Sequence, residues 1–302
     1  MIIRVVSAVV LTGVVIGCAG ERWPDPPAVE SSAYEAEHDA WRDEQRGMLA
    51  GVLPIVGIWP LPDGETAFGA EASLPIVLPS TDVPDRAGVF RRTGMTITVI
   101  PAPGAPLTLE DGTPISDPQE AGTVIAGSIR LEVAAADDDR RWVMAMDQNH
   151  PAVQDPPAVE TYPLDPRWRV AARLDAFATP KPVRVADVRG GFMDFVAPGE
   201  LVFRLDDQEM RLTALGFPGE DRFFVMFKDP TNASTTYSGY RILTPEVVAA
   251  GEWTVIDFNF ASNPPCAYSR YTVCPLPPPE NRLPVAIEAG LKRLPSAQGF
   301  TP

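Results

Sequence analysis

The residues best suited to ligand chemistry lie close together near the C-terminus. They carry carboxylate, amide, hydroxyl or guanidinium groups: Asp229, Thr231, Tyr237, Arg241, Asp257, Asn259, Asn263, Asn281 and Arg282. Alternation along a strand would place Asp257 and Asn259 on one face and Phe258 on the other. A polar strand face beside an arginine could hold a small anionic or sugar-like ligand. We therefore predict a polar pocket in which Asp229, Arg241 and Asp257 lie close together.

Two other interpretations of these residues stay open. In the first they are structural, because prolines at positions 264, 265, 275 and 277–279 interrupt strand pairing and leave carbonyls that Asn and Arg side chains can bind. In the second the chain is a hydrolase-like enzyme. Asp229 or Asp257 would then act as the acid/base, and Arg241 or Arg282 would clamp an anion.

The rest of the sequence contains no motif that is specific for catalysis. Its two histidines, His38 and His150, lack partners at metal-ligand spacing, and no G-x-S-x-G, P-loop or G-x-G-x-x-G sequence is present. The formal net charge of −15 would repel the phosphate backbone of nucleic acids. We therefore expect no metal, no other cofactor and no nucleic-acid partner, and the catalytic residues of any enzyme activity remain unknown.

The N-terminus carries the features of an export signal. Arg4 precedes an apolar run over residues 5–16, which is shorter than the roughly 20 residues a membrane-spanning helix needs. The following Gly17-Cys18 resembles the lipobox of bacterial lipoproteins. That resemblance implies a signal peptide over 1–17, lipidation of Cys18, and an exported protein held in the cell envelope only by its lipid. Ala19, where inner-membrane retention typically uses Asp, implies the outer membrane if the source is Gram-negative.

Cys266 and Cys274 are the two remaining cysteines once Cys18 is lipidated. An even pair in an exported protein predicts a disulfide. Unpaired thiols, a reactive cysteine and a metal-ligand pair are the alternatives.

The elements that must position these residues are mostly strands. Residues 18–31 are expected to form the lipidated cysteine and a flexible tether. Ser32 and Glu35 then resemble a capping box that opens a helix ending near Leu49. From about Leu53 onward the chain shows short β-branched or alternating runs at 95–100, 124–133, 170–174, 201–205, 209–215, 222–227 and 253–258.

This pattern predicts a mainly β fold, sandwich or barrel-like, with one N-terminal α-helix. Residues 32–295 would form a single β-rich domain, with two lobes divided near 150–166 as the alternative arrangement. Residues 296–302 would be a disordered tail.

The C-terminal block resembles the bacterial family called domain of unknown function 1684. The matching strings are N-P-P-C-A at 263–267, C-P-L-P-P at 274–278 and N-R-L at 281–283, after D-P-T-N at 229–232 and I-D-F-N at 256–259. The resemblance extends from the Trp41 helix onward and is strongest over the last 75 or so residues. Ala233, Tyr240, Ile242 and Ser262 depart from the family pattern. The family implies no activity, so the expected function is binding of a small polar ligand or an envelope partner.

Overall fold

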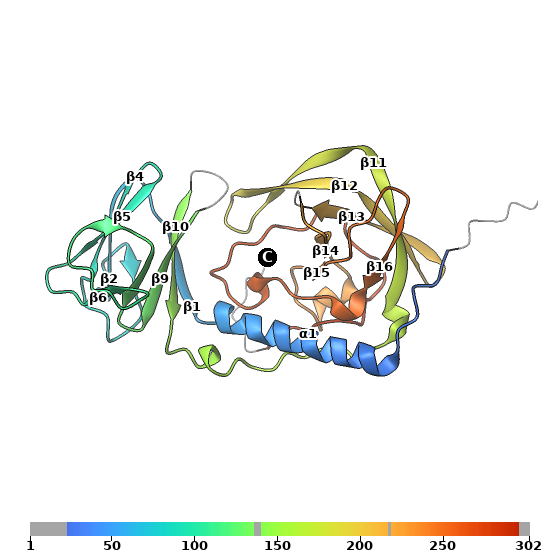
Figure 1. Ribbon diagram of the computed structural model, residues 1–302, viewed down its shortest axis with the longest axis horizontal. Helices are drawn as coiled ribbons and strands as arrows, with labels where there is room; N and C mark the ends of the chain where they lie inside the picture. The colour runs from blue at the N-terminus through green and yellow to red at the C-terminus, as the bar shows by residue number, and fades with distance from the viewer. Residues whose placement is uncertain (1–22, 136–139, 217–218, 296–302) are drawn as a thin grey trace, which may run out of the picture.

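The protein is mainly β with one long helix, which confirms the predicted fold class. The structure, a computed structural model, describes residues 23–135, 140–216 and 219–295. The predicted signal peptide, Cys18 and the tail at 296–302 lie outside these ranges. Within them, no helix is both long and apolar enough to cross a membrane. Two groups of strands, each around its own core, lie side by side and are joined by α1 (Ser31–Val52) and by residues 148–168 (Figure 1).

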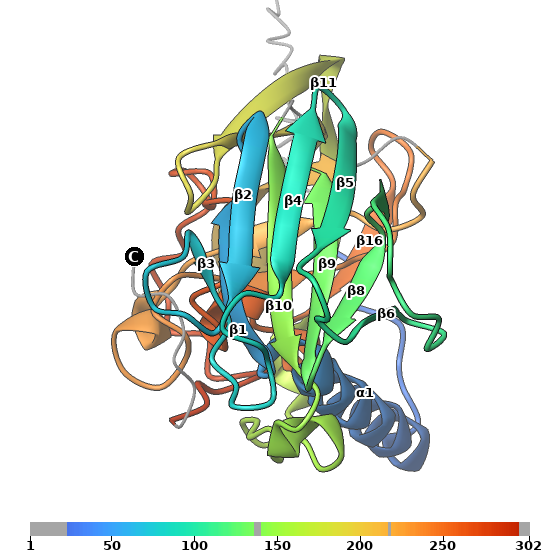
Figure 2. The ribbon, with the colours of Figure 1, turned by 90° about the vertical axis from the view of Figure 1, so that its left-hand side faces the viewer.

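The N-terminal lobe, residues 55–147, is a sandwich of two sheets. Its strands are β1 (Ile55–Pro60), β2 (Gly64–Gly69), β3 (Ile76–Val77), β4 (Gly88–Thr93), β5 (Thr96–Pro101), β6 (Leu107–Leu109), β7 (Gln119–Glu120), β8 (Thr123–Ala126), β9 (Ile129–Ala135) and β10 (Arg141–Asp147). One sheet has the order β1-β10-β9-β8-β6 and the other β3-β2-β4-β5-β7. In Figure 2 the strands β2, β4 and β5 lie in front of the sheet that contains β10 and β9. Buried rings such as Phe68 and Phe90, 4.6 Å apart, fill the space between the sheets.

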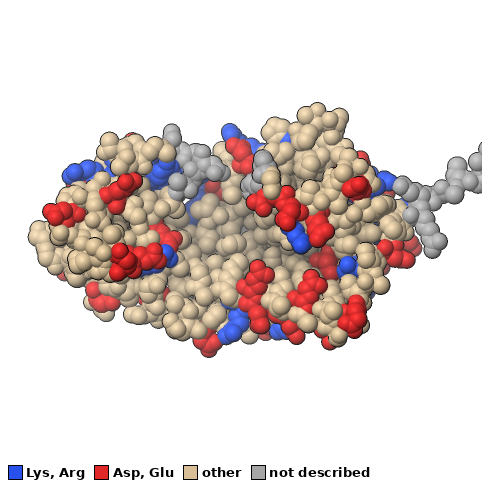
Figure 3. Space-filling model, viewed as in Figure 1, with Lys and Arg blue, Asp and Glu red and all other residues tan. Residues whose placement is uncertain are grey.

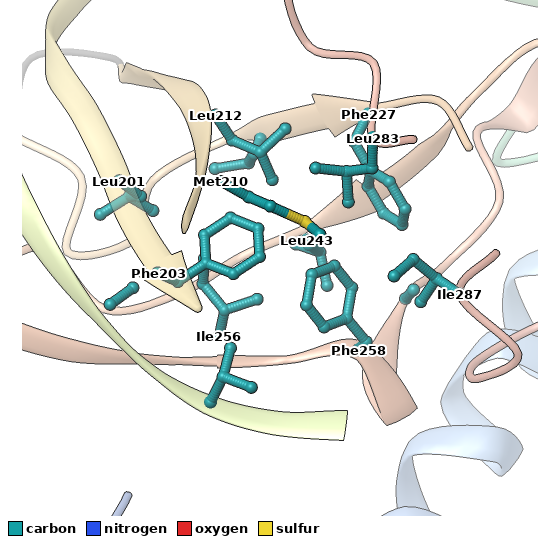
Figure 4. Close-up of a cluster of buried hydrophobic side chains, with 14 of the residues drawn as sticks. Leu201, Phe203, Met210, Leu212, Phe227, Leu243, Ile256, Phe258, Leu283 and Ile287 are labelled. Atoms are coloured by element: carbon teal, nitrogen blue, oxygen red, sulfur yellow. The ribbon is translucent and has the colours of Figure 1, made fainter. Parts of the chain in front are cut away.

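The C-terminal lobe, residues 169–291, carries most of the predicted site residues. Its strands are β11 (Arg169–Ala186), β12 (Phe192–Leu205), β13 (Gln208–Gly216), β14 (Val225–Phe227), β15 (Arg241–Leu243) and β16 (Trp253–Asp257). A four-stranded sheet, β13-β12-β11-β16, packs with the β14-β15 pair. In Figure 4 the side chains of Phe203, Met210, Phe227, Leu283 and Ile287 converge on one core. Phe227 and Leu283 are thus core residues from two segments far apart in the sequence.

The connection between the lobes contains short turns of 3₁₀-helix, η1 (Pro151–Val153) and η2 (Pro166–Trp168), and covers the region where the sequence allowed a division. A direct ion pair also joins the lobes. Arg140 Nη2 lies 3.3 Å from Asp187 Oδ2 in the turn between β11 and β12, and the Asp187 carboxylate is 1% exposed. Because Asp187 also accepts the backbone N–H of Arg189 and Gly191, its charge is held in place by the turn.

Helix α1 is anchored to the C-terminal lobe through aromatic side chains on one of its faces. Tyr34 is buried, and the Trp41 ring lies 5.3 Å from that of Phe260. The predicted capping box at Ser32 is wrong: the helix begins at Ser31, and the Glu30 carboxylate caps it by accepting the N–H groups of Ser32 and Ala33. A longer acidic side chain fulfils the same need for an acceptor at the free N–H groups of the first turn.

The chain before α1 also contacts this lobe. The ring of Trp23 meets that of Trp253 edge to face at 5.1 Å, and the Arg204 guanidinium lies 5.0 Å from the Trp23 centroid. Arg169 donates a hydrogen bond to the carbonyl of Pro27. Residues 23–27 therefore lie along the C-terminal lobe.

Candidate functional site

The structure brings Asp229 and Arg241 together in a fully buried ion pair. Arg241 Nη2 lies 2.8 Å from Asp229 Oδ1, and both side chains are 0% exposed. Arg241 also donates to the carbonyls of Ile287 (2.9 Å) and Ala289, and its guanidinium lies 4.9 Å from the Phe227 ring centroid. Burial lowers the pKa of Arg241, and the adjacent Asp229 carboxylate opposes that shift. The pair thus joins β15 to the backbone of the C-terminal segment.

The Asp229 carboxylate has no accessible oxygen left for a substrate. Oδ1 accepts Thr231 Oγ1 at 3.0 Å in addition to Arg241, and Oδ2 accepts the backbone N–H of Thr231 (3.1 Å) and of Ile287 (2.8 Å). Asp229 therefore serves as the N-cap of the short helix η3 (Pro230–Ala233), where Asn232 completes a capping box. These four donors occupy the carboxylate and hold the loop in place.

Thr231 and Tyr237 belong to the same loop. Asn232 Nδ2 donates to the carbonyl of Tyr237 at 2.6 Å, and Thr231 Oγ1 lies 2.9 Å from Thr236 Oγ1. Burial raises the pKa of Tyr237 to about 12, so the phenol is neutral at physiological pH. These contacts fix the loop's shape from within.

Asp257 lies in a separate network, so the structure does not join the three predicted residues. Its Oδ2 accepts Tyr34 Oη at 2.7 Å and lies 3.5 Å from Arg169 Nε, while Oδ1 accepts the backbone and side-chain amides of Asn259. Among the residues the structure describes, it shares no polar partner with Arg241. Burial and the Asp257 carboxylate both raise the pKa of Tyr34. This network fastens α1 to the end of β16.

The strand alternation expected at Asp257 and Asn259 is wrong. β16 ends at Asp257, and residues Phe258–Phe260 form the 3₁₀-helix η4, which Asp257 caps by accepting the Asn259 N–H. Asn259 instead donates to the Asp165 carbonyl (2.9 Å) and accepts the Asp165 N–H (3.1 Å). An aspartate cap favours this turn over a continued strand.

Asn281 and Asn263 have the structural role that the sequence left open. Asn281 is 0% exposed, accepts Thr213 N–H at 2.7 Å and donates to the carbonyls of Thr213 and Met226. Asn263 donates to the Lys292 carbonyl at 2.9 Å. Both side chains replace backbone pairing in a segment rich in proline.

Cys266 and Cys274 form a disulfide, with their Cα atoms 6.3 Å apart. Both sulfurs are buried against Tyr237 and Val188. Beyond the bridge, Cys274 O accepts the Val188 N–H and Leu276 N–H donates to Ala186, so the bridged loop is bound to the turn between β11 and β12. Within the described ranges, no group of three His, Cys, Asp or Glu side chains could hold a metal ion.

Of the predicted residues, Arg282 alone is exposed, and it meets Lys228, which the sequence argument missed. The two residues form a parallel bridge, in which Lys228 donates its N–H to Asn281 O and accepts that of Leu283, both at 2.8 Å. They line a pocket of about 580 Å³ together with Asp229, Pro230, Asn232, Ala233, Ser238, Leu283 and Pro284. Since the Asp229 side chain is 0% exposed, its main chain forms that wall. In the sequence, Lys228 is marked only by its position next to Asp229.

Neither cation of this pocket has an acidic partner among the described residues. Across the part of the chain that the structure describes, no acidic side chain lies within ion-pair distance of Lys228 or Arg282, and neither side chain donates a hydrogen bond. Burial, and to a smaller extent the charge of Arg282, lower the pKa of Lys228. Elsewhere in the protein arginines are commonly paired, as Arg211 is with Asp175 and Glu200.

A known protein family matches this lobe. Residues 157–292 match the family described as protein of unknown function DUF1684, so a DUF1684 domain is found there. The match begins after the N-terminal lobe and α1, a narrower extent than the sequence resemblance suggested. No curated protein matches the chain. An uncharacterized protein of Haloarcula marismortui, solved by solution NMR, is 29% identical over 45% of this chain and 76% of its own, with a TM-score of 0.40.

Proposed function

We propose that this protein is a lipid-anchored cell-envelope protein whose C-terminal lobe binds a small anionic ligand between Lys228 and Arg282. The observation that carries the proposal is this pair of cations, which have no acidic partner among the described residues, at one pocket of an otherwise acidic chain. Figure 3 illustrates that acidity, with Asp and Glu side chains spread over α1 and the C-terminal lobe. In such a field a local pair of cations defines where an anion binds.

The pocket is also built on a rigid base. Asp229 and Asn281, which flank Lys228 and Arg282 along the chain, are held by the buried hydrogen bonds described above. Pro230, Leu283 and Pro284 add apolar walls. Two cations on a fixed base with apolar walls suit a ligand that has an anionic end and a less polar body.

The geometry disfavours the hydrolase alternative. Asp229 is inaccessible and its oxygens are occupied, and Asp257 is bound by Tyr34, Arg169 and Asn259. Neither carboxylate can approach a proton on a substrate without breaking several hydrogen bonds. Binding without turnover fits these contacts better.

Binding is tested by calorimetric titration of the purified full-length protein with sulfate. We expect saturable binding that weakens about tenfold or more in each of Lys228→Met and Arg282→Met, since each removes one charge-assisted contact. Lys181→Met, which removes an exposed lysine on β11 outside the pocket, should leave the affinity unchanged. Equal affinity in all four proteins, or no saturable binding, would refute the proposed site.

Lipid anchoring is supported by the order Arg4, apolar run and Gly17-Cys18. Two or more acyl chains on Cys18 would give stable membrane attachment. We expect Cys18→Ala to move the protein out of the membrane fraction or to leave its precursor uncut. Mass spectrometry that finds a free thiol at residue 18 of the native protein would contradict the proposal.

A further inference from the structure

We propose that the anionic group bound between Lys228 and Arg282 is a doubly charged phosphate monoester. This inference rests on the proposed function and specifies the chemistry of its ligand.

The side chains of Lys228 and Arg282 leave the same face of the paired backbone. Phe227 and Leu283 are buried in the same hydrophobic core, where Figure 4 shows their side chains next to each other. Lys228 follows Phe227 and Arg282 precedes Leu283, so alternation along each segment turns both cations away from the core. Because the two residues are opposite each other in a parallel bridge, their side chains leave the same face.

The backbones of Lys228 and Arg282 are close enough for both side chains to reach one small ligand. Paired backbones lie about 4.8 Å apart, so both cationic side chains start close enough to reach a single compact group. The planar guanidinium of Arg282 can bind two oxygens of a tetrahedral anion, and the ammonium of Lys228 can bind a third. A dicarboxylate would have to fold its two charged ends into that same space.

The two positive charges of the pocket are best matched by two negative charges on one ligand. Lys228 and Arg282 repel each other, and no described side chain compensates them, because the nearby Asp229 is already paired with Arg241. A carboxylate would neutralise one of the two cations. A phosphate monoester above its second ionisation carries close to two negative charges and neutralises both.

The chemistry has two sources, a soluble phosphate ester and the headgroup of phosphatidic acid. Pro230 and Pro284 at the pocket wall would contact the carbon skeleton beside the ester in either case. One set of measurements must therefore identify the charge of the bound group, and another must identify whether it belongs to a soluble ester or to a lipid.

The test compares glycerol 3-phosphate, sulfate and acetate on the full-length protein between pH 5 and 7.5. Glycerol 3-phosphate should bind at least about tenfold more tightly than acetate, and its association constant should rise about tenfold across this range as the ester reaches its second charge near pH 6. Sulfate is doubly charged throughout, so its curve reports the pocket's own groups, Lys228, Arg282 and Asp229. It should lack this rise.

A second arm uses phosphatidylcholine vesicles with and without phosphatidic acid. A loss of glycerol 3-phosphate binding on phosphatidic-acid vesicles would assign the lipid source, and unchanged binding would assign the soluble one. Either result supports the inference. Equal affinity for acetate and glycerol 3-phosphate with parallel pH curves would overturn the inference but leave anion binding intact. Binding of no anion would overturn both.

Discussion

Arg241→Met should lower the free energy of unfolding by about 3–5 kcal/mol, because it leaves the Asp229 carboxylate buried without its counter-charge. The variant also loses the two hydrogen bonds from Arg241 to Ile287 and Ala289, which hold the C-terminal segment. Urea unfolding followed by tryptophan fluorescence measures the change.

The matched control is the double variant Asp229→Leu/Arg241→Met. It removes both charges, so its cost should be well below the sum of the two single variants. Strictly additive costs would show that the two residues act independently and would contradict the ion pair as the base of this lobe.

Breaking the Cys266–Cys274 disulfide should lower the free energy of unfolding by about 2–3 kcal/mol, the chain-entropy value for a loop this short. The double variant Cys266→Ser/Cys274→Ser and the reduced wild type should unfold at the same urea concentration. The bridge also binds the turn between β11 and β12 through Val188 and Ala186, so that turn should become the first site of proteolytic cleavage.

Reducing agent provides the control for this second experiment. It should lower the stability of the wild type and leave the double serine variant unchanged. A thiol count that finds Cys266 and Cys274 free in oxidised, denatured wild type would contradict the disulfide.

The sequence predicted the fold best where local pattern and burial agree. The helix expected from Ser32 to near Leu49 matches α1 to within about three residues at its C-terminus. Its Tyr34 and Trp41 side chains pack on the C-terminal lobe, so burial supports the local helical pattern. The β-type run at 124–133 is divided in the structure into a hairpin, β8–β9, that turns at Gly127. The φ of Gly127 is +58°, a left-handed conformation that glycine adopts without strain.

The candidate site was only partly predictable, because its contacts join segments distant in sequence. Asp229 and Arg241 are twelve residues apart, so the high density of polar residues in this segment was enough to group them. Asp257 lies in a different network because it accepts a hydrogen bond from Tyr34, 223 residues earlier in the chain. No local sequence pattern indicates that contact. Lys228 is a candidate site residue only because its backbone bridge to Arg282 places two cations together.

Binding of an anion between Lys228 and Arg282 can be followed residue by residue in a titration of ¹⁵N-labelled full-length protein with inorganic phosphate. We expect saturable shifts of backbone amides around the pocket, with one dissociation constant for all: Lys228, Asn232, Ser238, Arg282 and Leu283. Shifts that cluster instead around Arg42 and Arg46 at the other pocket, or none that saturate, would contradict it.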